Sequence, residues 1–277
     1  RPPGRIEGGS ETRGRFLMAE AERSVAFDRA ADFYDATRSF SPEAQSRITE
    51  MLAAELRGRG LCLEIGVGTG RIALPLAEAG IPIAGVDISA PMIAKLLEKR
   101  GGSAPVSVSL ADATRLPFAD GSFGAAVSCH VLHLIPQWQS AVSELVRTLD
   151  RGGVILVDQG GWRQGILREL EKEFSRIAGV SRPFVGVQRV EELDEEMSRR
   201  GATVRILPRV RDTRPISPGS VITLLEQKVF SFTWSLDDDT CRRAAEATRE
   251  WARERFGSLD EPVDVILQTG WRAYDLS

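Results

Sequence analysis

Short apolar runs and amphipathic stretches alternate along the middle of this 277-residue chain. The apolar runs cover 61–65, 81–86, 106–110, 123–129 and 154–157, and patterns typical of helices separate most of them, over 71–79, 91–100 and 138–149. Strands that are apolar at nearly every position are buried on both faces, which is typical of a parallel sheet covered by helices. Right-handed crossovers then predict an α/β fold with a doubly wound, mostly parallel sheet, whose core is expected at 58–160.

The segments on either side of this core follow different patterns. Residues 1–15 are rich in Gly, Pro and Arg and predict a flexible tail, whereas 16–57 predict N-terminal helices. The pair Ser41-Pro42 is typical of a helix start, because Ser caps the first turn and Pro is tolerated at the first helical position. The segment 161–277 predicts the remainder of the sheet with a helical lid inserted at about 213–260. Outside that lid, helices are expected over 163–179 and 189–200, a strand over 203–208, and a last strand or hairpin over 263–274.

Composition narrows the classes of function. A net charge of −3 and a pI of about 5.7 disfavour general nucleic-acid binding. No apolar run reaches the ~18–20 residues that a membrane span needs, and no leader pattern is visible, so a cytoplasmic location is expected. The three cysteines stand far apart and only two histidines occur, so neither a disulfide framework nor a metal centre is expected.

The most specific segment is LCLEIGVGTG at 61–70, where a strand runs into a turn with glycine at every second position. Glycine allows a positive φ and a close approach of ligand to backbone, and the helix that follows presents free N–H groups. A dinucleotide fingerprint would need Gly or Ala where the chain has Arg71, and a phosphate-binding P-loop would need a Gly-Lys pair that the sequence lacks. The turn therefore favours a ligand that brings no phosphate.

Two acidic residues follow the next strands. Asp87 ends the second strand, where a carboxylate can accept hydrogen bonds from the two hydroxyls of a ribose. Asp112 follows the third strand, where it can accept from an exocyclic amine such as that of adenine. Together with the glycine turn they predict an adenosine pocket; the alternative is that each acid only caps a strand end.

At this point the chain resembles the class I S-adenosylmethionine-dependent methyltransferases, in the quinone-biosynthesis-like branch known as methyltransferase type 11. The matching stretches cover roughly 60–158 in order and are LEIGVGTGRIALPLAEAG, GVDISAPMI, ADATRLPFADGSFGAAVS and LVRTLDRGGVILV. The resemblance implies a Rossmann-like methyltransferase fold with a seven-stranded sheet, S-adenosyl-L-methionine as cofactor and S-adenosyl-L-homocysteine as product. One departure is Gly124, where the family usually has Asp; we expect this loss to affect local capping more than cofactor binding.

The resemblance also implies roles for individual residues. The methionine part of the cofactor would lie against residues of the turn and the fourth strand, namely Glu64, Gly66, Val67, Gly68, Gly70 and Ser128. The nucleoside would be held by Asp87 at the ribose and by Ile88, Met92, Asp112 and Ala113 near the adenine. Tyr34 and Arg38 resemble a segment that closes over the cofactor, with Arg38 pairing with its carboxylate; alternatively, both are ordinary surface residues of a helix.

Two histidines, His130 and His133, follow the fourth strand and are the candidate catalytic residues. A neutral imidazole there can accept a proton from a substrate hydroxyl or amine, whereas the alternative is a hydrogen bond to a loop carbonyl. Five aromatic residues of the expected lid either line an apolar acceptor pocket or hold the lid together: Phe230, Phe232, Trp234, Trp251 and Phe256.

The sequence thus predicts a methyltransferase that moves a methyl group from S-adenosylmethionine to a small-molecule acceptor by in-line displacement. We expect a monomer or homodimer with no nucleic-acid or membrane partner and no metal. Two other functions stay open. A nicotinamide-dependent oxidoreductase would use a related sheet, although Arg71 speaks against it, and a catalytically silent cofactor-binding module would keep the fold.

Overall fold

The computed structural model describes residues 24–100, 106–158, 162–163, 165–181 and 185–277. The expected flexible tail at 1–15 and the first part of the N-terminal segment lie outside these residues. Within them, no helix is long and apolar enough to cross a membrane.

A seven-stranded sheet forms the core, in the order β3-β2-β1-β4-β5-β10-β7. Its strands are β1 (Cys62–Ile65), β2 (Ile83–Asp87), β3 (Ser107–Leu110), β4 (Phe123–Cys129), β5 (Leu149–Asp158), β7 (Thr203–Ile206) and β10 (Trp271–Asp275). The first five strands pair in parallel, and β10 runs antiparallel to both β5 and β7. The strand order reverses direction at β1 and β4, which is where open α/β sheets bind ligands beyond the carboxyl ends of the strands.

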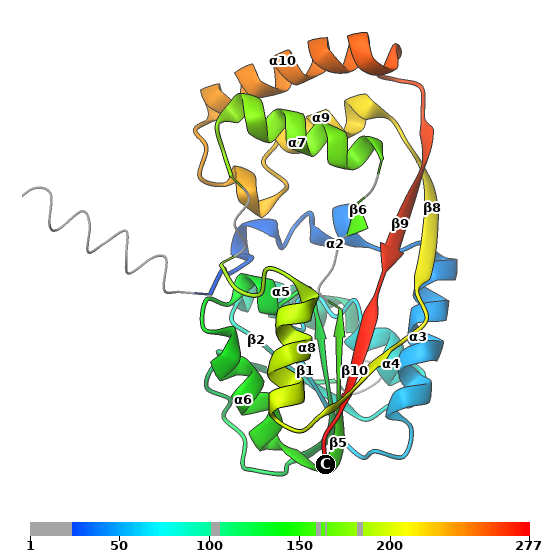
Figure 1. The fold of residues 1–277 in the computed structure, drawn as a ribbon, viewed down its shortest axis with the longest axis vertical. Helices are drawn as coiled ribbons and strands as arrows, with labels where there is room; N and C mark the ends of the chain where they lie inside the picture. The colour runs from blue at the N-terminus through cyan, green and yellow to red at the C-terminus, as the bar shows by residue number, and fades with distance from the viewer. Residues whose placement is uncertain (1–23, 101–105, 159–161, 164, 182–184) are drawn as a thin grey trace, which may run out of the picture.

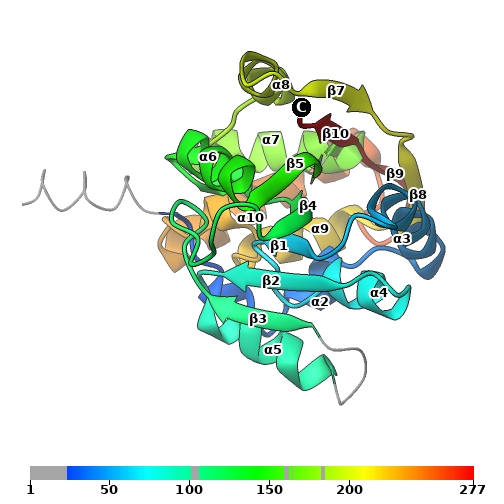
Figure 2. The same ribbon diagram turned by 90° about the horizontal axis from the view of Figure 1, so that it is seen from below.

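Helices cover both faces of this sheet, as predicted (Figure 2). One face packs against α3 (Pro42–Leu56), α4 (Ala73–Glu78) and α5 (Ala90–Arg100), and the other against α6 (Trp138–Thr148) and α8 (Val190–Arg199). Strand residues alternate between the two faces: Cys62 packs with the first group of helices and Leu63 with the second. Both are almost fully buried, which explains the continuous apolar runs.

Gly124 lies where β4 approaches the chain that leads into β1. Its backbone N–H donates to the carbonyl of Leu61 at 3.0 Å. A Cβ at this position would overlap the carbonyl oxygen of Arg59 and lie 2.6 Å from its carbonyl carbon. The glycine therefore permits a close backbone approach that an Asp here would prevent.

A second unit, which we call the lid, lies over the carboxyl ends of the strands (Figure 1). It consists of a three-stranded sheet in the order β6-β9-β8 and three long helices. Its strands and helices are β6 (Trp162–Arg163), α7 (Ile166–Ala178), β8 (Val210–Ile216), α9 (Pro218–Glu226), α10 (Asp238–Phe256) and β9 (Val263–Thr269). The helices share an apolar core of their own that includes Phe174, Ile222 and Ala245.

The lid is larger than the helical insertion expected at 213–260. Helices α9 and α10 lie in that range and begin at the caps Ser217 and Asp237, but α7 packs with them from before β7. Residues 210–216 form strand β8, which pairs with β9 from Val210–Thr269 to Ile216–Val263. Because β8 is an edge strand of its sheet, it tolerates Pro215, which cannot donate to a ladder.

The N-terminal segment runs between core and lid (Figure 1). It contains the short helices η1 (Asp28–Ala30) and α2 (Tyr34–Arg38) before α3. The predicted cap of α3 is present, since the Ser41 hydroxyl accepts from the Ala44 backbone N–H at 3.2 Å. On the lid side, the ring centroids of Phe27 and Trp234 lie 5.1 Å apart.

Candidate functional site

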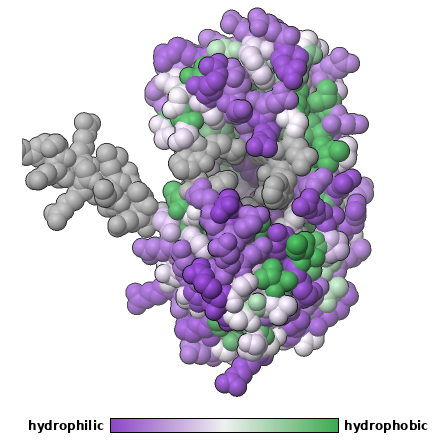
Figure 3. Space-filling model, viewed as in Figure 1, coloured by the Kyte–Doolittle hydropathy of each residue, from purple (hydrophilic) through white to green (hydrophobic). Residues whose placement is uncertain are grey.

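A cavity of about 870 Å³ lies between the carboxyl ends of the core strands and the lid. The space-filling view shows the molecule hollowed between these two units (Figure 3). Three parts of the chain line it: the strand ends, the N-terminal segment and the lid. Of the predicted site residues, the lining includes Tyr34, Arg38, Gly66, Gly68, Asp87, Ile88, Met92, Asp112, Ala113, His130 and His133.

The glycine turn brings backbone to the cavity wall at Gly66 and Gly68, whose φ angles are 63° and 55°. A Cβ at Gly66 would overlap Cγ2 of Val131, and one at Gly68 would lie 3.3 Å from the methyl group of Met92. Both positions therefore favour glycine by conformation, and Gly66 is also required by space. The turn's other predicted residues, Glu64, Val67 and Gly70, lie behind this wall.

Glu64 is a buried acid at the end of β1, only 2% exposed. Burial raises its pKa well above the ordinary value, and the nearby charge of Arg71 opposes this rise. Among the described residues, its Oε2 has no hydrogen-bond partner. The acid thus lies beneath the turn with one carboxylate oxygen that no described residue satisfies.

Asp87 both holds the turn and faces the cavity. Its Oδ2 accepts from the Gly68 N–H at 2.8 Å, and its Oδ1 accepts from the Ser89 N–H at 2.8 Å. Burial raises its pKa, while these backbone N–H groups lower it. A carboxylate offers about four acceptor positions, so acceptor capacity for a ribose remains beside these backbone donors.

Asp112 follows β3 and is exposed to the cavity. Its Oδ1 accepts from the backbone N–H of Thr114 at 2.9 Å and from the Thr114 hydroxyl at 2.8 Å. Asp87 and Asp112 therefore both cap the chain that follows their strands, which was the alternative role considered for them. It does not exclude ligand binding, because Oδ2 of Asp112 takes no part in these two bonds.

Tyr34 and Arg38 lie on α2, facing the cavity from the N-terminal segment. Burial raises the pKa of the Tyr34 hydroxyl. The Arg38 guanidinium lies 4.7 Å from the ring centroid of Phe230, a lid residue. Both predicted residues are thus part of the cavity wall, and Arg38 contacts the lid.

Arg71 is a site residue that the sequence analysis missed. Its side chain lines the cavity, and its Nη1 donates to the Arg38 carbonyl at 2.7 Å. Its Nη2 lies 3.4 Å from Cys129 Sγ and 3.4 Å from His130 Nδ1. The residue entered the sequence analysis only as evidence against a dinucleotide fingerprint, although an arginine next to a ligand-binding turn was itself a signal.

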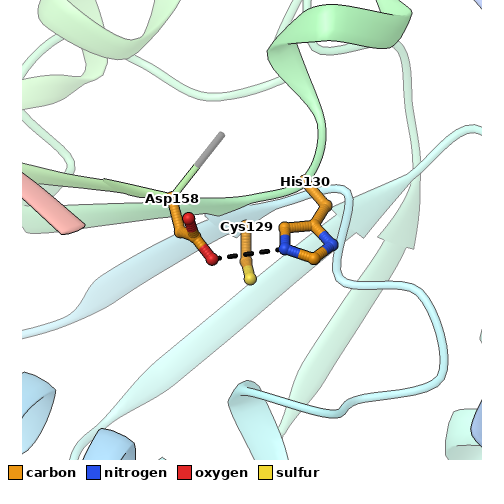
Figure 4. A group of neighbouring side chains, drawn as sticks. All are labelled: Cys129, His130 and Asp158. Atoms are coloured by element: carbon orange, nitrogen blue, oxygen red, sulfur yellow. Dashed lines mark hydrogen bonds and ion pairs between the residues drawn. The ribbon is translucent and has the colours of Figure 1, made fainter. Parts of the chain in front are cut away.

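His130 forms a pair with Asp158 at the ends of β4 and β5 (Figure 4). Its Nε2 lies 3.2 Å from Oδ2 of Asp158, and its φ is 61°. Because a guanidinium only donates, Nδ1 accepts from Arg71 and Nε2 carries the hydrogen. Burial and the charge of Arg71 lower the pKa of His130. The imidazole is therefore neutral at neutral pH, with both nitrogens engaged.

Cys129, His130 and Asp158 also form a group whose potential metal-ligand atoms lie within 4.8 Å of one another. The Arg71 guanidinium contacts two of these atoms, and burial raises the pKa of the Cys129 thiol, so that the thiol stays protonated. The fixed positive charge of Arg71 opposes a metal ion at this place. The group is better described as an arginine-centred hydrogen-bond cluster.

The prediction for Ser128 has mixed geometric support, because its Oγ has no hydrogen-bond partner among the described residues but the residue does not line the cavity. The residue is fully buried in β4, and its neighbours Cys129 and His130 line the cavity in its place. Alternation along a strand directs neighbouring side chains to opposite faces, so Ser128 and Cys129 cannot both face the same space. Its role toward the methionyl group stays a prediction.

The sequence of this chain is similar to those of known proteins. A family model described as a methyltransferase domain matches residues 63–157. A phosphatidylethanolamine N-methyltransferase from Cereibacter sphaeroides is 32% identical over 178 residues, which is 62% of this chain and 82% of that protein. The chain belongs to the class I S-adenosylmethionine-dependent methyltransferases.

Other similarities to this methyltransferase are more partial. A demethylmenaquinone methyltransferase from Renibacterium salmoninarum is 30% identical over 139 residues, 49% of this chain, and the chain spans 57% of that protein. The solved structure of YcgJ from Bacillus subtilis has a TM-score of 0.58 at 20% identity, covering 84% of this chain and 98% of that one. The solved structure of a phospholethanolamine N-methyltransferase 2 from Haemonchus contortus contains phosphomonomethylethanolamine and S-adenosylhomocysteine. It has a TM-score of 0.54 at 19% identity, covering 90% of this chain and 57% of that one. The solved structures establish the fold, and none of these proteins supports the nicotinamide alternative.

Proposed function

We propose that this methyltransferase acts on a small, partly apolar acceptor held between the core and the lid. The observation that carries the proposal is this cavity, which joins the strand ends to a partly apolar lid surface. That surface includes Leu167, Val221, Leu224, Phe230 and Leu267. Relatives are named for phosphatidylethanolamine and demethylmenaquinone, and an acceptor with an apolar portion suits this surface.

In this proposal the core half of the cavity holds the cofactor, which when bound supplies a methyl group on a positively charged sulfur. Asp87 accepts from the ribose hydroxyls, and Asp112 and Ala113 contact the adenine with Ile88 and Met92. The backbone at Gly66–Gly70 and the buried Glu64 surround the methionine part, with Ser128 behind them. Tyr34 and Arg38 close the cavity from the N-terminal segment. The unsatisfied Oε2 of Glu64 and the two glycine positions support the fit.

The lid half of the cavity also contains a hydroxyl suited to the acceptor. Thr269, at the end of β9, is 8% exposed and lines the cavity. Its Oγ1 has no hydrogen-bond partner among the described residues. By contrast, the equally buried Asp212 is satisfied by Arg214 at 2.6 Å and by the Ser41 N–H at 3.1 Å. A buried hydroxyl without a partner loses about 1–3 kcal/mol of hydration, which a ligand group restores. We assign Thr269 to the acceptor.

The chain contributes to methyl transfer mainly by positioning. Holding the acceptor in line with the methyl group and excluding water can supply on the order of 7–11 kcal/mol. His130 and His133 face the acceptor from the cavity wall. His130 accepts a proton only after its Nδ1 leaves Arg71. Removal of a proton from the acceptor therefore depends on His133 or on that rearrangement. The same proposal places the enzyme in the cytoplasm, as a monomer or homodimer without a nucleic-acid partner.

Calorimetric titration with S-adenosylhomocysteine tests the cofactor site. The wild-type protein should bind it, and Asp87→Ala should abolish measurable binding, because the variant loses both the ribose acceptor and the carboxylate that holds Gly68. Asp264→Ala, which removes an exposed acid of β9, is the matched control and should bind as the wild type does. Binding of NADH in place of S-adenosylhomocysteine, or full affinity in Asp87→Ala, would contradict the proposal.

A further inference from the structure

Arg71 connects three parts of the cavity wall that are far apart in the sequence. It follows the glycine turn and precedes α4, and its side chain lines the cavity. Its guanidinium reaches the N-terminal segment on one side and the ends of β4 and β5 on the other. A planar group with five donors in a fixed arrangement can make both sets of contacts at once.

The first set of contacts holds the N-terminal segment against the turn. Nη1 of Arg71 donates to the Arg38 carbonyl at 2.7 Å, at the end of α2, where helical carbonyls lack partners within the helix. The guanidinium also lies 4.7 Å from the ring centroid of Phe40 and 5.9 Å from that of Tyr34. One side chain thus ties the segment that closes the cavity to the turn that binds the cofactor.

The second group of contacts determines the orientation and the protonation of the His130 ring. Nη2 donates toward Nδ1 at 3.4 Å while Nε2 faces Asp158 at 3.2 Å, so both ring nitrogens are engaged and the ring orientation is fixed. The charged or titratable groups that face this ring are Arg71 from the turn, Cys129 from β4, Asp158 from β5, and Arg38 from α2. The two arginines disfavour a protonated imidazole and Asp158 favours it.

We propose that Arg71 is a positioning residue of the methyl-transfer site, which fixes His130 as a neutral imidazole in the cavity wall and holds α2 over the bound cofactor. The proposal rests on the proposed cofactor site. It goes beyond that site because it assigns two separable effects to one side chain. The effect on His130 depends on charge, and the effect on α2 depends on the two-sided geometry of a guanidinium.

Two variants separate these effects. Arg71→Met keeps an apolar stem of similar length but removes the charge and the donors. Arg71→Lys keeps the charge but cannot reach the Arg38 carbonyl and the strand ends together. Arg176→Met removes a charge from the outer surface of α7, where the Arg176 side chain is 69% exposed, and serves as the control. The chain has only two histidines, so the imidazole signals in NMR are assigned by comparison with a His133→Gln spectrum.

In Arg71→Met we expect the pKa of His130 to rise, because a nearby positive charge is lost. In Arg71→Lys we expect that pKa to stay near the wild-type value. Both variants should bind S-adenosylhomocysteine about tenfold more weakly, since each loses the link to α2. Arg176→Met should change neither quantity.

Two results overturn the inference: an unchanged His130 titration in Arg71→Met, or wild-type affinity for S-adenosylhomocysteine in Arg71→Lys. If Arg71→Met fails to fold, the affinity of Arg71→Lys for S-adenosylhomocysteine still decides the test. Failure of the wild-type protein to bind S-adenosylhomocysteine would instead contradict the proposed function. The histidine titration is recorded without ligand, so it distinguishes the two failures.

Discussion

Replacing Gly66 by alanine tests whether the glycine turn is constrained by space as well as by conformation. The residue has a φ of 63°, and a Cβ there would overlap Cγ2 of Val131 and lie 3.0 Å from Cγ1. A left-handed backbone costs a non-glycine residue about 1–2 kcal/mol. Forcing an extra carbon into a packed site costs about 1–3 kcal/mol more. Gly66→Ala should therefore lower the free energy of unfolding by about 2–5 kcal/mol.

Gly80 provides the matched control, because its φ is 84° and nothing lies within 4 Å of a Cβ built on it. Gly80→Ala should show the conformational cost alone, about 1–2 kcal/mol. Val131→Ala removes both methyl groups, the one that overlaps and the one at 3.0 Å. In that background, Gly66→Ala should cost close to what Gly80→Ala costs, which gives a coupling energy of about 1–3 kcal/mol between positions 66 and 131.

Urea unfolding followed by tryptophan fluorescence measures these free energies, and calorimetric titration with S-adenosylhomocysteine shows whether the distorted turn still binds. Equal losses in Gly66→Ala and Gly80→Ala would refute the reasoning, as would costs at positions 66 and 131 that simply add. Either result would mean that Val131 does not hold the turn in place.

Three further predictions follow from buried groups. Gly124→Ala should destabilise the protein by more than about 3 kcal/mol in urea, because the new Cβ meets the Arg59 backbone, which cannot rotate away; a loss below 1 kcal/mol would contradict that packing. Glu64 has a folded pKa well above its ordinary 4.5, so the folded state binds more protons and stability falls as pH rises from 4.5 through the folded pKa. Glu64→Gln should remove this fall in urea unfolding series at several pH values; parallel curves for the two proteins would show that Glu64 does not titrate differently on folding. Thr269→Val should leave the melting temperature unchanged or raise it while weakening acceptor turnover through KM; a clear loss of stability would show that the hydroxyl already has a protein partner.

Local patterns in the sequence determined the core elements with good accuracy. The fourth strand was expected at 123–129 and is β4 (Phe123–Cys129), because a run buried on both faces stands out from its polar flanks. The cap at Ser41 was also identified, because capping involves residues only three positions apart. The positions of Asp87 and Asp112 beside the cavity followed from strand ends that share one edge of a parallel sheet.

The lid was harder to predict. Strand β8 has four consecutive polar residues, 211–214, followed by Pro215, so it lacks a regular strand pattern, and pairing with β9 stabilises it. Helix α7 has its own amphipathic pattern, but nothing local indicates that it packs with α9 and α10, which come after β7 in the chain. The position of α7 is set by burial of its apolar face, and its own sequence does not specify which other helices cover that face.

The chemistry of the cavity wall was decided by tertiary structure alone. The bond from Arg71 to the Arg38 carbonyl joins residues 33 positions apart, and the pair of His130 and Asp158 joins residues 28 positions apart. The sequence by itself determined the fold that binds the cofactor, because the glycine turn after the first strand and the acids at the ends of the second and third strands are local signals. The hydrogen bonds of the His130 ring and the lack of a partner for the Thr269 hydroxyl among the described residues depend on which groups come together in the folded protein. Burial and partner geometry, which no short segment encodes, fix both.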